Sequence, residues 1–390
     1  MDKLLKNEKI KKVILFIMAC LAALSLVQGC RNAMEASQDF QWDAAKAFTL
    51  KINPYDESLN PGRIPKEYEF EKYYLQMEAN QFPSLLILLI PFTFLPPLTA
   101  RYIWLLCNLL FTIGMFFLLR KTFLKELDGF SFWFLVLFTI SGTPYRNQLG
   151  VGQHTLFAFF FFLLAVYGLR FSGKKGFVLT TLGLFVCYFK YTLTAVLLLY
   201  FIYKKKYKEV LVSVLMHVFL TFVSAIWLSD SFINMIIKPL KVSSALVAEG
   251  GIDIGVLLKG SPFAYVLTLV IMAALFIFCI KLGPSRDGLV ISILILWSLI
   301  ITYHRSYDFF VLMAVAALFI NEDVKKIVKY HYLILIFYIN YILRLFSENT
   351  LSKLGAGILY YSFTLVVTYL GIRALTKGEK GENPGNGMDG

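Results

Sequence analysis

The chain alternates long apolar runs with short polar segments. A helix needs about 20 apolar residues to cross the hydrocarbon core, and it satisfies its own backbone hydrogen bonds there. The pattern therefore predicts an all-α polytopic membrane protein with about 12 transmembrane helices. The expected spans are 13–30, 98–119, 130–143, 153–170, two short spans within 177–203, 210–228, 261–281, 288–303, 309–320, 332–346 and 355–375.

Residues 82–97, FPSLLILLIPFTFLPP, are apolar but are not expected to cross the membrane. The run is short, and Pro91, Pro96 and Pro97 interrupt it. The next run, 98–119, ends in the basic sequence RKTFLKE, which the positive-inside rule places in the cytoplasm. We therefore expect 82–97 to form a juxtamembrane or re-entrant helix.

Residues 177–203 form one apolar run with basic sequences on both sides, GKK before it and KKKYK after it. Both flanks are expected to be cytoplasmic, so the run must cross an even number of times. We expect two short, broken spans that meet near YFKYT (188–192). This arrangement places Lys190 at the outer surface.

The composition supports a membrane protein, because 58% of the 390 residues are hydrophobic and only 16% are charged. The net charge of +13 comes from bases clustered between the spans, so it indicates topology and not nucleic-acid binding. The lysine-rich N-terminus and the even number of spans place both termini in the cytoplasm of a multi-pass protein of the cytoplasmic membrane. Five cysteines, most of them within spans, imply no disulfide framework.

The one long polar segment, residues 31–83, follows the first span and is expected outside the cell. We expect a single transmembrane domain over 1–376, in which 31–97 forms an outer catalytic loop with juxtamembrane helices. The Gly-rich polar segment 377–390 is expected to be a disordered cytoplasmic tail.

A short helix is expected over residues 38–50, lying on the membrane by its apolar side. The apolar stripe consists of Phe40, Ala44, Ala47 and Phe48. Asp39 is the candidate general base, because a carboxylate at the lipid–water boundary can take the proton of a sugar hydroxyl. Alternatively, Asp39 only stabilises the N-terminus of the helix. Asp43, four residues on, is a weaker candidate that a solvated helix face explains as well.

Further polar residues collect at the outer ends of the expected spans. Lys190, His304 and Arg305 suit phosphate binding, because fixed cations stabilise the charge of a leaving phosphate. Anchoring to lipid head groups is the alternative. Gln153 could contact a sugar hydroxyl or serve helix packing, and Arg146 is a further candidate at the same end. No motif for a metal or a nucleotide is visible, so we expect neither a metal nor a cofactor.

Several short motifs follow one another between residues 38 and 312: DFQWDAA (39–45), NPY (53–55), the proline-flanked run that leads into ARYIW (100–104), GQ (152–153), FVCYFK (185–190) and YHRSYD (303–308). This series resembles the GT-C glycosyltransferases and, within them, glycosyltransferase family 87, which includes polyprenyl-phosphate-mannose-dependent mannosyltransferases. One departure is Thr155, where many relatives have Asn two residues after the Gln.

The resemblance implies a GT-C-like fold and an inverting glycosyltransferase. The donor would be a polyprenyl-phosphate sugar, with mannose or another hexose or a pentose, and the acceptor would be linked to a lipid or glycan. The active site would face outward. Asp39 takes the place of the family's first-loop aspartate, and the NPY motif makes Tyr55 a candidate substrate-binding residue. Membrane lipid is the other expected partner, and no nucleic acid is expected.

Two other functions are considered, a transporter or flippase for lipid-linked saccharides and a polymerase for them. Transporters place polar sites near the middle of the bilayer and often contain inverted repeats. Here the polar residues gather at one end, and no repeat is visible. A polymerase is expected to carry its dominant outer loop late in the chain, where this sequence has only the modest segment 229–260.

Overall fold

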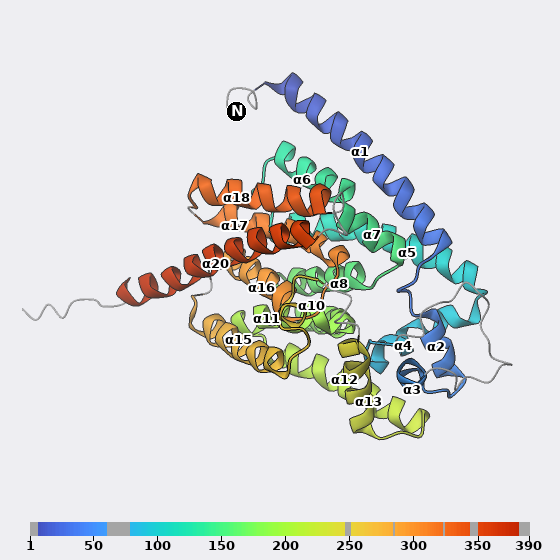
Figure 1. The fold of residues 1–390 in the computed structure, drawn as a ribbon. Helices are drawn as coiled ribbons and strands as arrows, with labels where there is room; N and C mark the ends of the chain where they lie inside the picture. The colour runs from blue at the N-terminus through green and yellow to red at the C-terminus, as the bar shows by residue number, and fades with distance from the viewer. Residues whose placement is uncertain are drawn as a thin grey trace, which may run out of the picture.

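The computed structural model describes residues 7–60, 79–245, 251–283, 285–322, 324–343 and 350–381, and every regular element in these ranges is helical (Figure 1). The first half contains α1 Glu8–Glu35, α2 Trp42–Thr49, α3 Pro54–Leu59, α4 Pro83–Leu89, η2 Ile90–Phe94, α5 Pro97–Thr122, α6 Gly129–Ser141, α7 Thr143–Val151, α8 Thr155–Gly168, α9 Gly173–Cys187 and η3 Tyr188–Lys190. The second half contains α10 Tyr191–Leu197, α11 Leu199–Tyr203, α12 Tyr207–Trp227, α13 Phe232–Ala245, α14 Ile254–Leu257, α15 Pro262–Lys281, α16 Asp287–Ile301, η5 Ser306–Ala317, α17 Leu318–Asn321, α18 Lys326–Phe337, η6 Tyr338–Ile342 and α20 Thr350–Gly381.

Six helical stretches within the described ranges are long and apolar enough to cross a membrane, or seven if the bent pair α7–α8 counts as one span. The six are Glu8–Glu35, Pro97–Thr122, Gly173–Leu197, Tyr207–Trp227, Pro262–Lys281 and Leu351–Thr376. This number is below the expected 12. Several expected spans, among them 130–143, 288–303 and 309–320, are helices of only 10–17 residues, shorter than a full crossing needs.

The bundle is apolar inside and outside. Almost every residue of α16 is buried, and Figure 1 shows this helix within the bundle, which explains an apolar sequence without helical periodicity. The peripheral helices also turn large apolar side chains outward. Examples are Phe16, Ile113, Phe219, Leu269 and Leu365. Such an exterior suits a lipid environment, since a soluble protein does not expose so much contiguous apolar surface.

Residues 82–97 contain a broken helix. α4 begins at Pro83 and continues as the 3₁₀ helix η2, and α5 then begins at Pro97. Proline fits the first turn of a helix but breaks its interior, because it has no N–H and its ring clashes with the preceding turn. The short α4 packs against α2 and α12.

The segment 173–203 is a helical hairpin. Gly183 of α9 packs directly against Ala165 of α8. Phe201 of α11 lies against Phe162, which also belongs to α8, with ring centroids 5.9 Å apart. One continuous helix would separate residues 183 and 201 by about 27 Å. The chain must therefore reverse direction between residues 183 and 201. The segment thus consists of two short helical arms, although length and composition alone would count Gly173–Leu197 as one span.

The expected helix over 38–50 is shorter than the pattern indicated, because α2 begins only at Trp42. Gln41 has a left-handed backbone (φ 63°), which interrupts helical winding after Asp39. The apolar stripe is buried against protein: Phe40 stacks on Trp104, with ring centroids 5.1 Å apart, and α2 packs on α4 and η2. The elements α4 and η2 therefore cover the apolar side of α2, which was expected to lie on the membrane.

A polar network ties the first loop to the segment after α12. Lys238 of α13 pairs with Asp56 of α3 at 2.7 Å and with Asp230 at 2.5 Å. Asn53, which caps α3, also donates a hydrogen bond to Asp230 at 2.9 Å. As a result, α2, α3, α4 and α13 gather at one end of the molecule, here called the loop end (Figure 1).

At the C-terminus, α20 runs to Gly381, and residues 382–390 of the expected tail lie outside the described ranges.

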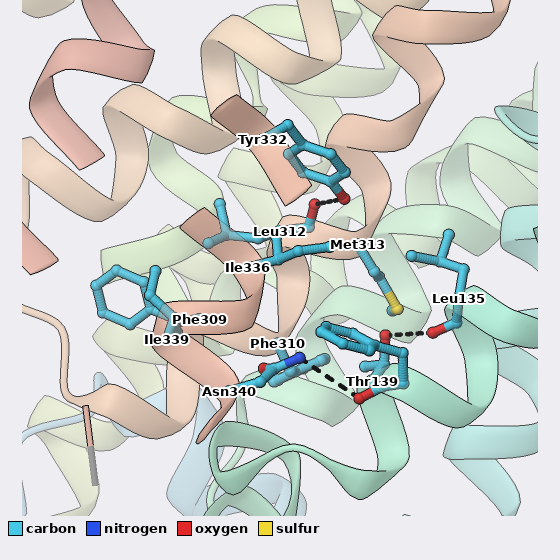
Figure 2. A pocket seen from close by; sticks show the side chains of 11 residues that line it. Leu135, Thr139, Phe309, Phe310, Leu312, Met313, Tyr332, Ile336, Ile339 and Asn340 are labelled. Atoms are coloured by element: carbon cyan, nitrogen blue, oxygen red, sulfur yellow. Dashed lines mark hydrogen bonds between the residues drawn. The ribbon is translucent and has the colours of Figure 1, made fainter. Parts of the chain in front are cut away.

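A separate small pocket lies between α6, η5, α18 and η6 (Figure 2). Its polar side chains already bond to backbone carbonyls: Thr139 to Leu135, Tyr332 to Leu312 and Asn340 to Phe138. The rest of the lining is apolar, so the pocket offers packing space and no reactive group.

Candidate functional site

Four interruptions of helical structure come together at the loop end. They are the turn between α1 and α2, the break between α7 and α8, the apex of the 173–203 hairpin and the turn between α16 and η5. Each presents polar side chains: Asp39; Gln153 and His154; Lys190; and His304, Arg305, Tyr307 and Asp308. Polar groups at helix breaks are free to bond to one another, whereas lipid-facing helical positions must be apolar.

Asp39 is held by backbone and side-chain hydrogen bonds. Its N–H donates to the carbonyl of Val151 at 2.7 Å, which fixes the turn against the end of α7. The Gln153 amide nitrogen donates to Asp39 Oδ2 at 3.0 Å and to the Tyr307 hydroxyl at 2.9 Å. The Tyr307 hydroxyl is thereby brought near the Asp39 carboxylate, whose pKa it lowers. These contacts hold the carboxylate of this partly buried residue in a fixed orientation.

The break before Gln153 depends on Gly152. This residue ends α7 with a left-handed backbone (φ 68°), a conformation that glycine adopts without strain. Its carbonyl accepts a hydrogen bond from the Trp104 indole at 2.8 Å. The axes of α7 and α8 consequently differ by 105°, and most of the segment between the expected spans 130–143 and 153–170 is the helix α7.

Lys190 brings a buried cation to the site. The residue closes η3 with a non-helical backbone (φ −105°, ψ 68°) at the hairpin apex, and its side chain is 5% exposed. Among the described residues, its ammonium has no hydrogen-bond or ion-pair partner within 4.0 Å. The carboxylates of Asp39 and Asp308 are its charged neighbours, and both interact electrostatically with the ammonium.

His304 and Asp308 form a buried pair. His304 Nδ1 lies 2.7 Å from Asp308 Oδ2, and the other carboxylate oxygen accepts a hydrogen bond from Thr155. His304 Nε2 lies 3.2 Å from the Thr192 carbonyl and 3.0 Å from the Thr302 hydroxyl. Both imidazole nitrogens therefore already have protein partners, and the pair joins α8, α10 and η5.

The environment of Asp39 shifts its acidity. Burial by the surrounding protein raises the pKa of Asp39 above its ordinary value. The charge of Lys190, the hydrogen bond from Tyr307 and the charge of Arg305 act in the opposite direction, and the charge of Asp308 adds to the rise. A carboxylate with a raised pKa takes up a proton more readily than an exposed one, which suits a general base.

The structure brings four of the eight predicted residues close to one another: Asp39, Gln153, Lys190 and Arg305. His304 is linked to them through Asp308. Arg305 is partly buried, and its Nε donates to the Tyr303 hydroxyl at 2.7 Å.

The other three predicted residues lie elsewhere. Arg146 turns toward α1 and donates to Gln28 at 3.1 Å. Asp43 is buried in the first turn of α2. Tyr55 is fully buried, and its hydroxyl donates to the Gln81 carbonyl at 2.9 Å.

Tyr307, His154 and Thr155 also contribute to this region but were not among the predicted site residues. Tyr307 belongs to the same YHRSYD motif as His304, but the motif does not reveal that its hydroxyl reaches the first loop. His154 is fully buried against Trp104, and neither ring nitrogen has a hydrogen-bond partner in the described part of the chain. Thr155, the departure noted above, supplies the hydroxyl that bonds to Asp308.

Comparison with known proteins adds one result to this geometry. The model of glycosyltransferase family 87 matches residues 83–320, which include Gln153, Lys190, His304 and Tyr307 but not Asp39. Neither a curated protein nor a solved structure matches the chain. Because the matched segment makes up more than half of the chain, the protein belongs to glycosyltransferase family 87 and is a membrane glycosyltransferase.

Proposed function

We propose that the protein transfers a sugar from a polyprenyl-phosphate donor to a lipid- or glycan-linked acceptor at the outer face of the cytoplasmic membrane. The observation that carries this proposal is the juxtaposition of Asp39, a carboxylate suited to proton uptake, with Lys190, a buried ammonium without a partner among the described residues. A buried ammonium without a direct hydrogen-bond or ion-pair partner is unfavourable by itself, so an anionic ligand would stabilise it. The phosphate of the donor supplies that anion.

The proposed reaction is a single inverting displacement. Asp39 takes the proton of the acceptor hydroxyl, whose oxygen forms a bond to the anomeric carbon of the sugar. The bond between that carbon and the phosphate oxygen breaks, and the phosphate leaves with the electron pair. Lys190, with Arg305 nearby, stabilises the charge that develops on the phosphate. Gln153 holds the carboxylate, and His304 and Asp308 fix the wall behind the ammonium.

The outward orientation is supported by charge. Bases cluster at the helix ends opposite the loop end, for example Lys9, Arg120, Lys174 and Lys204. Such clusters remain on the cytoplasmic side of a membrane. The loop end, with Asp39 and Lys190, therefore faces the exterior, where a lipid-linked donor and acceptor would meet. Mannose is the first sugar to test, followed by other hexoses and pentoses.

The test uses purified protein in proteoliposomes, undecaprenyl-phosphate mannose with a radiolabelled sugar, and a lipid extract of the source membranes as acceptor. Asp39→Asn keeps the shape of the side chain but removes the base. We expect transfer to fall at least about 100-fold, the low end of the range for general base catalysis, with donor binding retained.

Asp56→Asn is the matched control, because Asp56 lies in the same loop but pairs with Lys238. It should transfer at nearly the wild-type rate. If Asp39→Asn stays active while Asp43→Asn is inactive, the base is one turn further along. If donor lipid moves between leaflets without any transfer, the protein is a flippase and the proposal is wrong.

A further inference from the structure

Hydrogen-bond directions around Tyr307 can be worked out from the contacts. The backbone N–H of His154 donates to Gln153 Oε1 at 2.7 Å, which fixes the orientation of the Gln153 amide. The amide nitrogen then has two hydrogens, one directed to Asp39 Oδ2 at 3.0 Å and one to the Tyr307 oxygen at 2.9 Å. Because the Tyr307 oxygen accepts from Gln153, its own hydrogen is available to donate to Asp39.

Asp39, Gln153 and Tyr307 form a cluster, here called the ring, in which the Gln153 amide bonds to the other two side chains and the remaining hydrogen of Tyr307 is available to the Asp39 carboxylate. Tyr307 is 9% exposed in the first turn of η5, so its position is fixed by the turn that also carries His304. A carboxylate that accepts hydrogen bonds is stabilised in its ionised form, which opposes the effect of burial. The Gln153 amide therefore links the YHRSYD motif to the first loop.

We propose that Tyr307 is a positioning residue for this reaction: its hydroxyl, oriented by Gln153, holds the Asp39 carboxylate ionised and aligned toward the acceptor. This inference rests on the proposed function, since it assigns a supporting group to the proposed base. Tyr307 itself transfers no proton. When Asp39 becomes protonated, the hydroxyl of Tyr307 remains in place and the ring re-forms after the proton is released.

The pH dependence of transfer should change in a defined direction when the Tyr307 hydroxyl is removed. The base must be ionised, so transfer falls as the pH drops through the pKa of Asp39. Tyr307 lowers that pKa together with the charges of Lys190 and Arg305, while burial and Asp308 raise it. Removal of the Tyr307 hydroxyl must therefore raise the pKa, and the acid limb of the pH profile must move to higher pH.

The experiment compares the pH profiles of kcat/KM of wild type and Tyr307→Phe in the proteoliposome assay. We expect the acid limb to shift upward by about one to two pH units, the typical effect of a hydrogen bond to a charged group. At pH values well above the new limb, most of the rate should return. Tyr332→Phe is the control, because it also loses a buried hydroxyl, here bonded to the Leu312 carbonyl and not to Asp39.

A purely structural role for Tyr307 would lower the rate by the same factor at every pH, and that result would overturn the inference. If Tyr307→Phe does not fold, Gln153→Leu tests the same ring, since it removes the other donor and leaves Tyr307 unoriented. Its acid limb should also move upward, and an unshifted limb would again overturn the inference. Should Asp39→Asn retain wild-type transfer, the proposed base itself would be wrong, which is a different outcome.

Discussion

At the scale of single residues, Lys190 is the unusual group of the site. Its side chain is 5% exposed, and its ammonium has no partner within 4.0 Å among the residues that the structure describes. Most buried lysines are paired, because burial of an uncompensated charge is unfavourable. The folded protein therefore accepts lower stability at this position, and the anionic ligand that we propose would offset it.

We expect opposite effects of Lys190→Met on ligand binding and on stability. Loss of a charge-assisted contact should weaken binding of undecaprenyl phosphate by about 1.5–3 kcal/mol. The ligand-free protein should unfold at the same or a higher temperature, because an unpaired buried charge has been replaced by an apolar chain. Binding titrations and thermal unfolding in detergent measure the two effects.

Lys241→Met provides the control, since Lys241 is exposed on α13 at the same end of the molecule. Both its affinity and its stability should match those of the wild type. Unchanged affinity of Lys190→Met would assign Lys190 to head-group anchoring instead.

At the scale of elements, sequence patterns identified the features that depend on local chemistry. The prolines of 82–97 indicated a broken helix, and the basic flanks of 177–203 indicated a reversal near Lys190, because both signals are contained in the segment itself. The start of α2 was predicted too early. The left-handed backbone of Gln41 accompanies the packing of Phe40 on Trp104, a contact that the pattern of the loop alone does not contain.

The candidate site was predictable only in part for the same reason. Residue type and position indicated Asp39 and Lys190, but the bonds that orient them come from distant segments. Tyr307 and Gln153 are 154 positions apart in the chain, and no local pattern encodes their contact. Of the three predicted residues that lie elsewhere, Arg146 was chosen by its expected end of the molecule, Asp43 by its spacing from Asp39 and Tyr55 by the NPY motif. None of these signals determines the direction of a side chain.

The ionic network between α3 and α13 predicts a stability effect. The side chains of Lys238 and Asp230 are only 17% and 13% exposed, so solvent screens their pair incompletely. Lys238→Ala would leave Asp230 and Asp56 close together without their cation. We expect a loss of about 1–2 kcal/mol, between the limits for exposed and buried pairs, measured by chemical unfolding in detergent.

The same network predicts a pH effect of known sign. Burial works to raise the pKa of Asp230, but the bonds from Lys238 and Asn234 outweigh it and hold the pKa below its ordinary value. A lowered pKa contributes stability above the pKa of the unfolded chain, and this is lost as the pH falls through the folded-state value. The loss on acidification should be smaller in Lys238→Ala; an equal loss would assign the acid sensitivity to other groups.

At the scale of the whole molecule, the topology makes one prediction about accessibility. The loop end should face the exterior and the basic ends of the helices the cytoplasm. In a variant without native cysteines, an impermeant maleimide added to intact cells should label Asn60→Cys, in the first loop, and not Lys121→Cys, at the end of α5. Both positions should react after permeabilisation. Labelling of Lys121→Cys alone in intact cells would reverse the orientation.

The four helix breaks that form the site also set an order of assembly during synthesis. Asp39 leaves the ribosome 268 residues before Tyr307. At about 5–20 residues per second, this separation corresponds to about 13–54 s. During that interval the first loop lacks the partners that orient its carboxylate and adjust its proton affinity. A chain truncated before η5 therefore contains the proposed base but not its ring, and such a chain should not transfer sugar while it is still being made.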